Sequence, residues 1–392
     1  MSVLATKIRS IISEMEETHL ERTEVIWLLW NTALTGYNIV LLGPPGTGKS
    51  ALARDLCRRI EGQFFEILMG KMTTHEELLG PLSLKGLEND IYTRIGSGRI
   101  PDADLVFLDE TFKANPVILN AMLGILNERS FHNNGKVERL HLEMVVGASN
   151  EMPEDDAGLE ALWDRWHVRY LIEPLRDENS FVKMVQASLH GAQAEASSIT
   201  IDQLHDARRE VSEVAVSTDI AKGLFGVREH LAQQGMLISD RRMHQIMDLL
   251  RSQAWLNDRT DVAAEDCAVL RHCLWQDPSA GHRRIVNQVV SAIFQPYYGE
   301  FYDLVFRAKE HFDTGMRAIA PLDRSGNKVD GTERAQAATS ALSELKRIRE
   351  QMAAISAHVE LRDTNITAPL EREIAVVEQY RQKIQNGVLQ VS

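Results

Sequence analysis

The stretch Gly43–Ser50 reads GPPGTGKS and follows the apolar run NIVLL at Asn38–Leu42. It fits the pattern G-x-x-x-x-G-K-[ST], in which glycines let backbone N–H groups close around phosphate oxygens. The residues that follow, Ala51–Ile60, carry leucine and isoleucine at helical spacing. A buried strand, a glycine-rich turn and the positive N-terminus of a helix together make a phosphate-binding site. The sequence therefore predicts a nucleotide-binding α/β domain.

The same pattern assigns roles within the turn. Lys49 is expected to reach the β- and γ-phosphates, and the Ser50 hydroxyl is expected to bind Mg²⁺. The alternative is a tight strand-to-helix turn that holds no ligand. We favour ATP and Mg²⁺ as cofactors, with nucleotide contacts expected from Gly43, Pro44, Pro45, Gly46, Thr47, Gly48, Lys49, Ser50, Ala51 and Asp109.

Two further apolar runs end in polar residues that would complete the site. LVFLDE at Leu105–Glu110 reads as a buried parallel strand with two acids at its C-terminal end, where open α/β sheets bind ligands. Asp109 would hold Mg²⁺ through water, and Glu110 would polarise the attacking water. That role favours hydrolysis of ATP over transfer of its phosphate to a small molecule. MVVGAS at Met144–Ser149 is followed by Asn150, which could orient the same water.

Three arginines follow these strands. Arg165 comes after a short helical stretch in LEALWDRWHVRY, and Arg241 and Arg242 lie in the first turn of the helix expected in ISDRRMHQIMDLL. Cations in a first turn oppose the helix dipole, which is a mild cost. Taken singly, each arginine is more often a solvated or salt-bridged residue. Taken with the three motifs, they indicate a role at the nucleotide.

This ordered set of motifs resembles the AAA+ ATPases, more closely the MoxR group, and within it the regulatory ATPase variant A (RavA) type. The resemblance covers roughly residues 20 to 275 and is carried by LLGPPGTGKS, MTTHEELLGPLSLKGL, LVFLDETFKANPVILNAMLGILNERSF, VVGASNEMPE, LEALWDRW and SDRRMHQIMDLLRSQAWLNDR. It implies named roles for Lys49 and Ser50 (Walker A), Asp109 and Glu110 (Walker B), Asn150 (sensor 1), Arg165 (arginine finger) and Arg241 (sensor 2). Arg242 is the competing candidate for sensor 2.

The resemblance also implies an assembly and two insertions. Members act as homohexameric rings, so Arg165 would serve the ATP of the neighbouring subunit. Residues Met72–Ala103 are similar to the family's helix-2 insert, and Ser130–Val146 reads as a hairpin with its turn at Asn134 and Gly135. In related rings both insertions face the pore or the ring surface. The alternative is that both are connecting loops shaped only by packing.

We expect an α/β P-loop core with a parallel sheet between helices, an all-α lid and a C-terminal helical bundle or stalk. Their predicted bounds are 1–178, 179–280 and 281–392, and the α/β core should end near Glu173 and Pro174. In the last part, apolar residues recur at alternating spacings of four and three, which is typical of a coiled-coil seam. They are Ala341, Leu345, Ile348, Met352, Ile355 and Val359. Three antiparallel helices are the economical interpretation. The RavA type has a further β-rich domain that this sequence does not show, so the partners of that domain are not carried over.

Composition narrows the remaining function classes. A net charge of −13, from 56 acids and 43 bases, argues against a surface built to hold nucleic acid. Three cysteines without a C-x-x-C pair indicate neither a disulfide framework nor a zinc ribbon. No long apolar run or cleavable leader is recognisable, which predicts a cytoplasmic protein without membrane insertion. Asn327–Asp330 spells the guanine-reading pattern N-K-x-D but falls in a polar stretch outside the expected core, so ATP remains the expected nucleotide.

The leading hypothesis is a ring-forming ATPase that remodels a protein client or complex, or matures it in a chaperone-like way. MoxR-type ATPases commonly work with a partner that bears a von Willebrand factor A domain. The D-x-S-x-S metal motif of that domain does not occur here, so the adaptor would act in trans. The alternatives are a nucleic-acid motor or loader and a slow, nucleotide-gated scaffold.

Overall fold

The computed structural model describes residues 2–151, 162–190, 196–277, 280–294, 296–319, 331–360 and 367–391. The chain divides into two compact units, Met1–Val286 and Asn287–Ser392. The N-K-x-D stretch at Asn327–Asp330, the start of the helical stretch before Arg165 and the side chain of Val359 lie outside the described residues.

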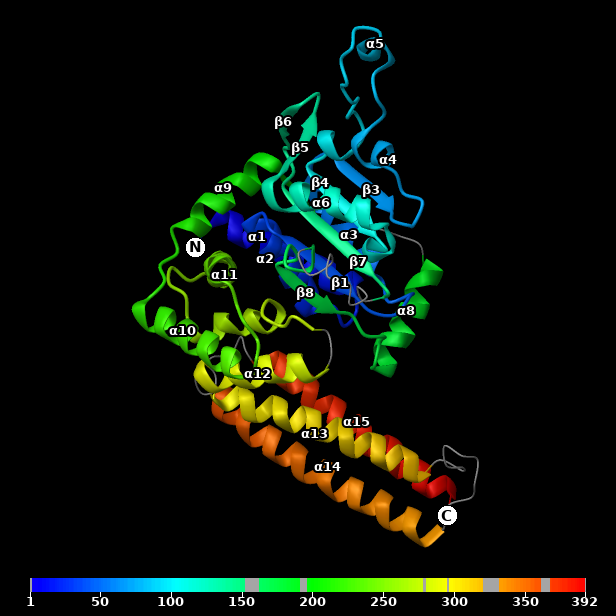
Figure 1. The fold of residues 1–392 in the computed structure, drawn as a ribbon. Helices are drawn as coiled ribbons and strands as arrows, with labels where there is room; N and C mark the ends of the chain where they lie inside the picture. Colours follow the sequence, from blue (N-terminus) through cyan, green and yellow to red (C-terminus); the bar gives the residue numbers. More distant parts are fainter. Residues whose placement is uncertain are drawn as a thin grey trace. The chain divides into compact units, whose positions relative to one another are not determined.

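The first unit is built on a five-stranded sheet with the order β3-β4-β7-β1-β8 (Figure 1). The strands are β1 (Asn38–Leu42), β3 (Phe64–Leu68), β4 (Leu105–Asp109), β7 (Met144–Ser149) and β8 (Val168–Leu171). Every pairing in this sheet is parallel. β1 and β7 are buried along their whole length, as expected for continuous apolar runs covered on both faces. The carboxyl ends of all five strands therefore meet at one edge of the sheet.

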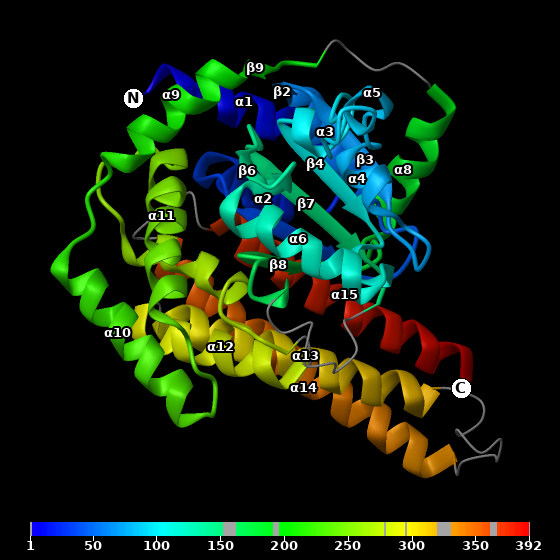
Figure 2. The same cartoon turned by 45° about the horizontal axis from the view of Figure 1, so that its top comes forward.

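Helices cover both faces of this sheet. α2 (Thr23–Thr35) packs on β1 and β8, and α3 (Lys49–Arg59) packs on β4 and β7. α6 (Pro116–Glu128) lies across the other face (Figure 2). Asn115 caps α6 by accepting a hydrogen bond from the Ile118 amide, and proline occupies its first position, where no amide hydrogen is needed.

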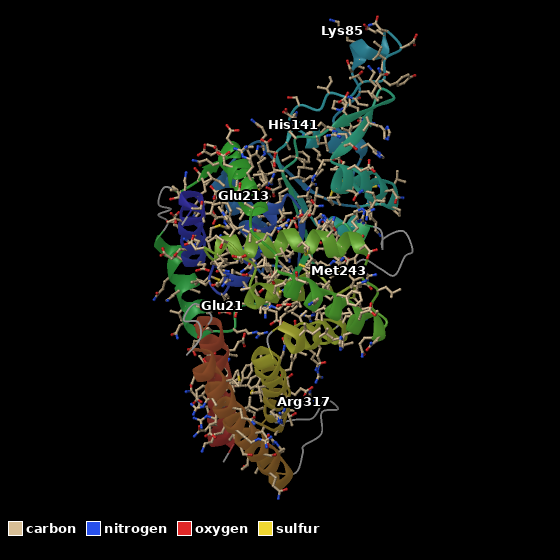
Figure 3. All side chains as sticks on the ribbon, turned by 90° about the vertical axis from the view of Figure 1, so that its left-hand side faces the viewer. Glu21, Lys85, His141, Glu213, Met243 and Arg317 are labelled. Atoms are coloured by element: carbon tan, nitrogen blue, oxygen red, sulfur yellow. The ribbon has the colours of Figure 1, made fainter. Side chains whose placement is uncertain are left out.

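The two segments predicted as insertions contact each other. The first carries α4 (His75–Leu79), α5 (Leu84–Leu87) and η1 (Ile100–Asp102); the second is the hairpin of β5 (Ser130–Asn133) and β6 (Lys136–Arg139). Asn134 and Gly135 have φ of 49° and 72° at the hairpin turn, which suits the predicted Asn-Gly pair. The Arg94 amide donates to Asn133 Oδ1 at 2.8 Å and so joins the insertions. Lys85 lies at the far tip of the first insertion, away from the sheet (Figure 3).

The remainder of the first unit is mainly helical. It contains α1 (Val3–Thr18), η2 (Thr111–Lys113), α8 (Glu178–His190), α9 (Ile201–Ser212), α10 (Thr218–Gln233), α11 (Asp240–Leu256), η3 (Ala264–His272), the start of α12 (Ala280–Phe294), and the short pair β2 (Ile60–Glu61) and β9 (Ile199–Thr200). α9 and α11 pack against α1 and α2. The predicted division into core and lid near residue 178 stays a prediction.

The second unit is a bundle of α13 (Pro296–Ile319), α14 (Gly331–Glu360) and α15 (Thr367–Val391), with the end of α12 before them. Each of the three long helices contacts the other two. From the predicted seam, Ala341, Leu345, Ile348 and Met352 are buried in its core, and Ile355 packs against it. The predicted fold class is confirmed. None of the helices in the described part of the chain is long and apolar enough to cross a membrane.

Candidate nucleotide-binding site

The glycine-rich turn joins β1 to α3 at the carboxyl edge of the sheet. Gly43 is buried with φ of 139°, and a Cβ there would lie 2.2 Å from the Ile172 carbonyl oxygen. Gly46 and Gly48 have φ of 78° and 87°, and a Cβ at either would meet no atom within 4 Å. Gly43 therefore lets the chain pass against the end of β8, whereas Gly46 and Gly48 shape an open turn towards solvent.

Lys49 lies at the base of this turn, as the first residue of α3. Its buried ammonium donates to the carbonyl oxygens of Gly43 and Pro44, both at 2.8 Å, and to Asn150 Oδ1 at 2.6 Å. Burial lowers the pKa of the Lys49 ammonium, while the nearby Glu110 and Asp109 carboxylates act in the opposite direction. The turn therefore holds a positive charge beneath its open backbone, which is the arrangement that a phosphate chain requires.

The two acids of β4 face the turn. Ser50 Oγ donates to Asp109 Oδ2 at 3.0 Å, so a hydroxyl and a carboxylate oxygen lie side by side. Oxygen ligands of this kind suit Mg²⁺. The Glu110 carboxylate accepts a hydrogen bond from the side-chain amide of Asn150. Glu110 also has a left-handed backbone, with φ of 52° and ψ of 41°, which is uncommon for a residue other than glycine and is frequent at functional sites.

The structure thus brings together the five residues predicted at this edge, Lys49, Ser50, Asp109, Glu110 and Asn150. Sequence reasoning missed a sixth residue, Lys113, whose Nζ lies 3.4 Å from Glu110 Oε2. Lys113 ends η2, and residues three apart lie on the same side of a 3₁₀ turn. The spacing of Glu110 and Lys113 in LDETFK was a signal that could have indicated this pair.

The three predicted arginines lie at the opposite edge of the sheet. The Arg165 carbonyl accepts from the side-chain amide of Asn38 at 3.0 Å, and Asn38 is the first residue of β1. The glycine-rich turn begins only after Leu42, the last residue of that strand. Four steps along a strand span roughly 13 Å, so Arg165 lies far from the nucleotide turn of its own chain.

Arg165, Arg241 and Arg242 meet around one acid, Asp164, which sequence reasoning did not identify as a functional residue. Asp164 Oδ2 lies 3.2 Å from Arg165 Nη1 and 2.6 Å from Arg241 Nη2, and its Oδ1 lies 2.9 Å from Arg242 Nη2. Arg241 also donates to Asn127 Oδ1, in the last turn of α6, at 3.2 Å. The side chain of Arg242 is only 5% exposed, whereas that of Arg241 is 45% exposed. Burial therefore favours Arg241 as the arginine that a nucleotide could reach, although the choice between them stays a prediction.

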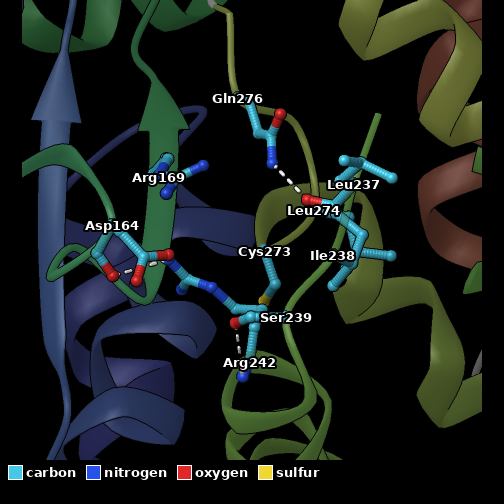
Figure 4. Close-up of a pocket in the computed structure, with 9 residues that line it drawn as sticks. All are labelled: Asp164, Arg169, Leu237, Ile238, Ser239, Arg242, Cys273, Leu274 and Gln276. Atoms are coloured by element: carbon cyan, nitrogen blue, oxygen red, sulfur yellow. Dashed lines mark hydrogen bonds and ion pairs between the residues drawn. The ribbon is translucent and has the colours of Figure 1, made fainter. Parts of the chain in front are cut away.

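A small pocket of about 120 Å³ lies next to this cluster (Figure 4). Its lining includes Arg242 and the buried Arg169 of β8. Arg169 donates to the carbonyl oxygens of Trp163 at 3.0 Å and Trp166 at 3.1 Å, and its guanidinium lies 4.7 Å from the centre of the Trp163 ring. These contacts identify Arg169 as a packing residue of the first unit, since its guanidinium donates its hydrogen bonds to backbone carbonyl oxygens.

Comparisons with known proteins identify the family. A family model described as the MoxR domain in the MoxR-vWA-beta-propeller ternary systems matches residues 6–209, and a model described as an AAA lid domain matches residues 219–290. The chain belongs to the MoxR group of AAA+ ATPases. The predicted group is confirmed, and a nucleotide is the ligand that this family implies for the turn.

Two uncharacterised proteins of Methanocaldococcus jannaschii are similar to this MoxR protein along most of their length. One is 36% identical over 304 residues, which is 77% of this chain and 78% of the relative. The other is 32% identical over 327 residues, which is 83% of this chain and 85% of the relative. A crystal structure of a candidate ATPase from Cytophaga hutchinsonii has a similar fold, with a TM-score of 0.62 and 18% identity over 73% of this chain and 94% of that chain.

Proposed function

We propose that this MoxR protein forms a homohexameric ring that hydrolyses ATP with Mg²⁺ and uses the energy to remodel a protein client. The observation that carries the proposal is the separation of its two sets of residues. The phosphate turn and the acids lie at the carboxyl edge of the sheet, and the arginines lie at the amino edge. A chain so arranged offers a nucleotide site on one side and a cationic group on another, and ring assembly would bring the two together.

At the carboxyl edge, the open turn and Lys49 would hold the phosphates, and Ser50 and Asp109 would hold Mg²⁺, Asp109 through water. The metal supplies charge stabilisation for the transferred phosphoryl group. Glu110 would orient and polarise the attacking water, and Asn150 would place that water beside the γ-phosphate. The hydrogen bond between Asn150 and Glu110 supports their joint role, since it puts both side chains over the same end of the sheet.

At the amino edge, Arg165 would act as the arginine finger on the ATP of the neighbouring subunit. Arg241 would act on the same ATP, because Asp164 holds its guanidinium beside that of Arg165. A sensor 2 role within its own chain fits less well, since the cluster is attached to the amino end of β1. Guanidinium groups suit this task because they remain charged and match the oxygens of a phosphate.

The proposed partners are a protein client and an adaptor with a von Willebrand factor A domain that acts in trans. The matching family model is described for a system that combines MoxR, vWA and β-propeller parts, which supports such an adaptor for this chain. The joined insertions expose large apolar side chains, which suit contact with protein. These are Met72, Leu84, Leu87, Ile91, Tyr92, Ile95 and Val137. The resemblance to the RavA type and the cytoplasmic location stay predictions.

A trapped complex tests this proposal. Glu110→Gln protein loaded with ATP should retain its client and adaptor on an affinity resin, while Lys49→Ala protein should retain neither. Enrichment of nucleic acid instead, together with DNA-stimulated hydrolysis by the wild type, would favour a nucleic-acid motor. Equal recovery of partners with both variants would show that partner binding does not depend on nucleotide and would contradict the proposal.

A further inference from the structure

The carboxylate of Asp164 holds together side chains from two distant parts of the sequence. Arg165 is its neighbour in the chain, whereas Arg241 and Arg242 come from the first turn of α11. In the described part of the chain, all three guanidinium groups lie within 3.2 Å of an Asp164 oxygen. The Asp164 carboxylate therefore links the three side chains, while Arg241 also donates to Asn127 Oδ1 and Arg242 to backbone carbonyl oxygens.

The two oxygens of Asp164 have different partners. Oδ1 pairs with Arg242, whose guanidinium also donates to the carbonyl oxygens of Asp164 at 2.7 Å and His167 at 3.1 Å. The amide of Arg242 donates to Ser239 Oγ at 3.2 Å, at the cap of α11. Arg242 is thus fixed at both ends and anchors the carboxylate, as the dashed contacts in Figure 4 show.

Oδ2 is shared by the two more exposed arginines. Arg165 and Arg241 have side chains that are 20% and 45% exposed, and that of Asp164 is 41% exposed. Arg165 Nε is buried and has no hydrogen-bond partner among the residues that the structure describes. Burial lowers the pKa of the Arg165 guanidinium, and the charge of Arg241 lowers it further. Without Asp164 these two cations would repel each other at short range.

We propose that Asp164 is a positioning residue that holds Arg165 and Arg241 as one two-arginine group for the phosphates of the neighbouring subunit. This inference rests on the proposed trans role of Arg165. Three cations and one carboxylate give the group a net charge of +2, and Glu128 is a further acid that acts on Arg165. A phosphate that approaches Oδ2 from the exposed side would therefore meet two guanidinium groups at a set spacing, with Arg242 keeping the carboxylate in place.

Asp164→Asn tests the inference in the full chain. The amide oxygen can still accept from Arg242, but the amide nitrogen cannot accept from Arg165 or Arg241. We expect kcat for ATP hydrolysis to fall on the order of 10-fold to 100-fold, as for a misplaced catalytic group, while KM for ATP stays unchanged. Asp240→Asn is the matched control, because Asp240 is an exposed acid of the same helix turn that pairs with Arg228 at 2.6 Å. The control should keep the kcat of the wild type.

Mixed rings distinguish positioning from a loss of folding. Asp164→Asn subunits have an intact nucleotide site, so mixing them with Lys49→Ala subunits, whose arginines are intact, should restore hydrolysis. A Lys49→Ala/Asp164→Asn double variant should restore hydrolysis by Arg165→Ala subunits about 10-fold to 100-fold less than Lys49→Ala does. A wild-type kcat in Asp164→Asn would overturn the inference. It would also be overturned if Lys49→Ala subunits rescue Arg165→Ala subunits but do not rescue Asp164→Asn subunits. If Lys49→Ala subunits do not rescue Arg165→Ala subunits either, the trans role of Arg165 is wrong and the inference is wrong with it.

Discussion

At the carboxyl edge of the sheet, charged and polar side chains satisfy one another, whereas at the amino edge three arginines share one carboxylate. Lys49 donates to Asn150 and to backbone, Ser50 donates to Asp109, and Lys113 pairs with Glu110. Around Asp164, one carboxylate pairs with the three guanidinium groups of Arg165, Arg241 and Arg242, so positive charge is in excess. The first edge is arranged to receive a ligand, and the second has positive charge left to offer one. Within one chain the two are separated by the length of β1.

Replacing Arg165, the proposed arginine finger, should have the largest effect on ATP hydrolysis. Arg165→Ala should lower kcat for ATP hydrolysis on the order of 10³-fold to 10⁵-fold, because a guanidinium that meets charge developing on the γ-phosphate has effects of that size. Binding of ATP, measured by equilibrium titration, should persist because the carboxyl edge is untouched. Arg228→Ala is the matched control, since Arg228 pairs with an exposed acid outside the cluster. Normal turnover in Arg165→Ala would remove the finger assignment.

At the carboxyl edge, replacing Glu110 should lower the rate of hydrolysis slightly less and should leave ATP binding unchanged. Glu110→Gln should bind ATP and lose turnover by about 10²-fold to 10⁴-fold, since an amide cannot polarise the water. Single-turnover hydrolysis together with nucleotide binding checks this expectation. The exposed Glu151, 3.9 Å from Lys113, supplies the control variant Glu151→Gln, which should turn over normally. Hydrolysis by Glu110→Gln at the rate of the wild type would show that the acid assignment is wrong.

Two glycines of the turn should differ in how much they contribute to the stability of the nucleotide-free protein. Gly43→Ala should lower the stability of nucleotide-free protein by about 3 kcal/mol, because its Cβ would collide with the Ile172 carbonyl oxygen. Gly46→Ala should cost about 1 kcal/mol, since only its left-handed backbone opposes a side chain. Thermal unfolding followed by circular dichroism compares them. Equal midpoints for the two variants would show that Gly43 does not pack as described.

The smallest effect on ATP binding is expected from removal of the second unit. It has its own buried core, so removing residues 295–392 should leave ATP binding unchanged and should abolish coupling to the client. The cut follows Phe294, the last residue of α12, so that helix is kept whole. Nucleotide titration of the purified truncated chain is the measurement. Loss of folded, nucleotide-binding protein would mean that the first unit needs the helical bundle.

Much of the carboxyl edge could be predicted from the sequence, because β1, β4 and β7 are apolar runs that lead directly into its functional residues. β1 and β7 have the bounds that their apolar runs predicted, and β4 ends at Asp109, one residue before the end of LVFLDE. β3 and β8 were both missed, and in β8 the reason is that Arg169 and Tyr170 interrupt the apolar pattern. Arg169 is buried only because it finds backbone carbonyls and the Trp163 ring.

The amino edge could be predicted only in part. The arginines were found through resemblance, but their meeting at Asp164 depends on α11 folding back onto a loop about 75 residues earlier in the chain. No local pattern encodes that contact. The nucleotide residues and the arginines lie at opposite edges because β1 begins at Asn38, next to Arg165, and ends at Leu42, before the glycine-rich turn.

We propose that the two edges of the sheet serve each other across a subunit boundary, and exchange of subunits is the sharpest test. A Lys49→Ala subunit has no working nucleotide site but an intact Arg165, and an Arg165→Ala subunit has the reverse. Each protein alone should be nearly inactive. Mixed rings, verified by mass spectrometry, should recover measurable ATP hydrolysis at the interfaces where one subunit complements the other. Verified mixed rings that remain as inactive as either parent would show that Arg165 does not act on the ATP of a neighbouring subunit.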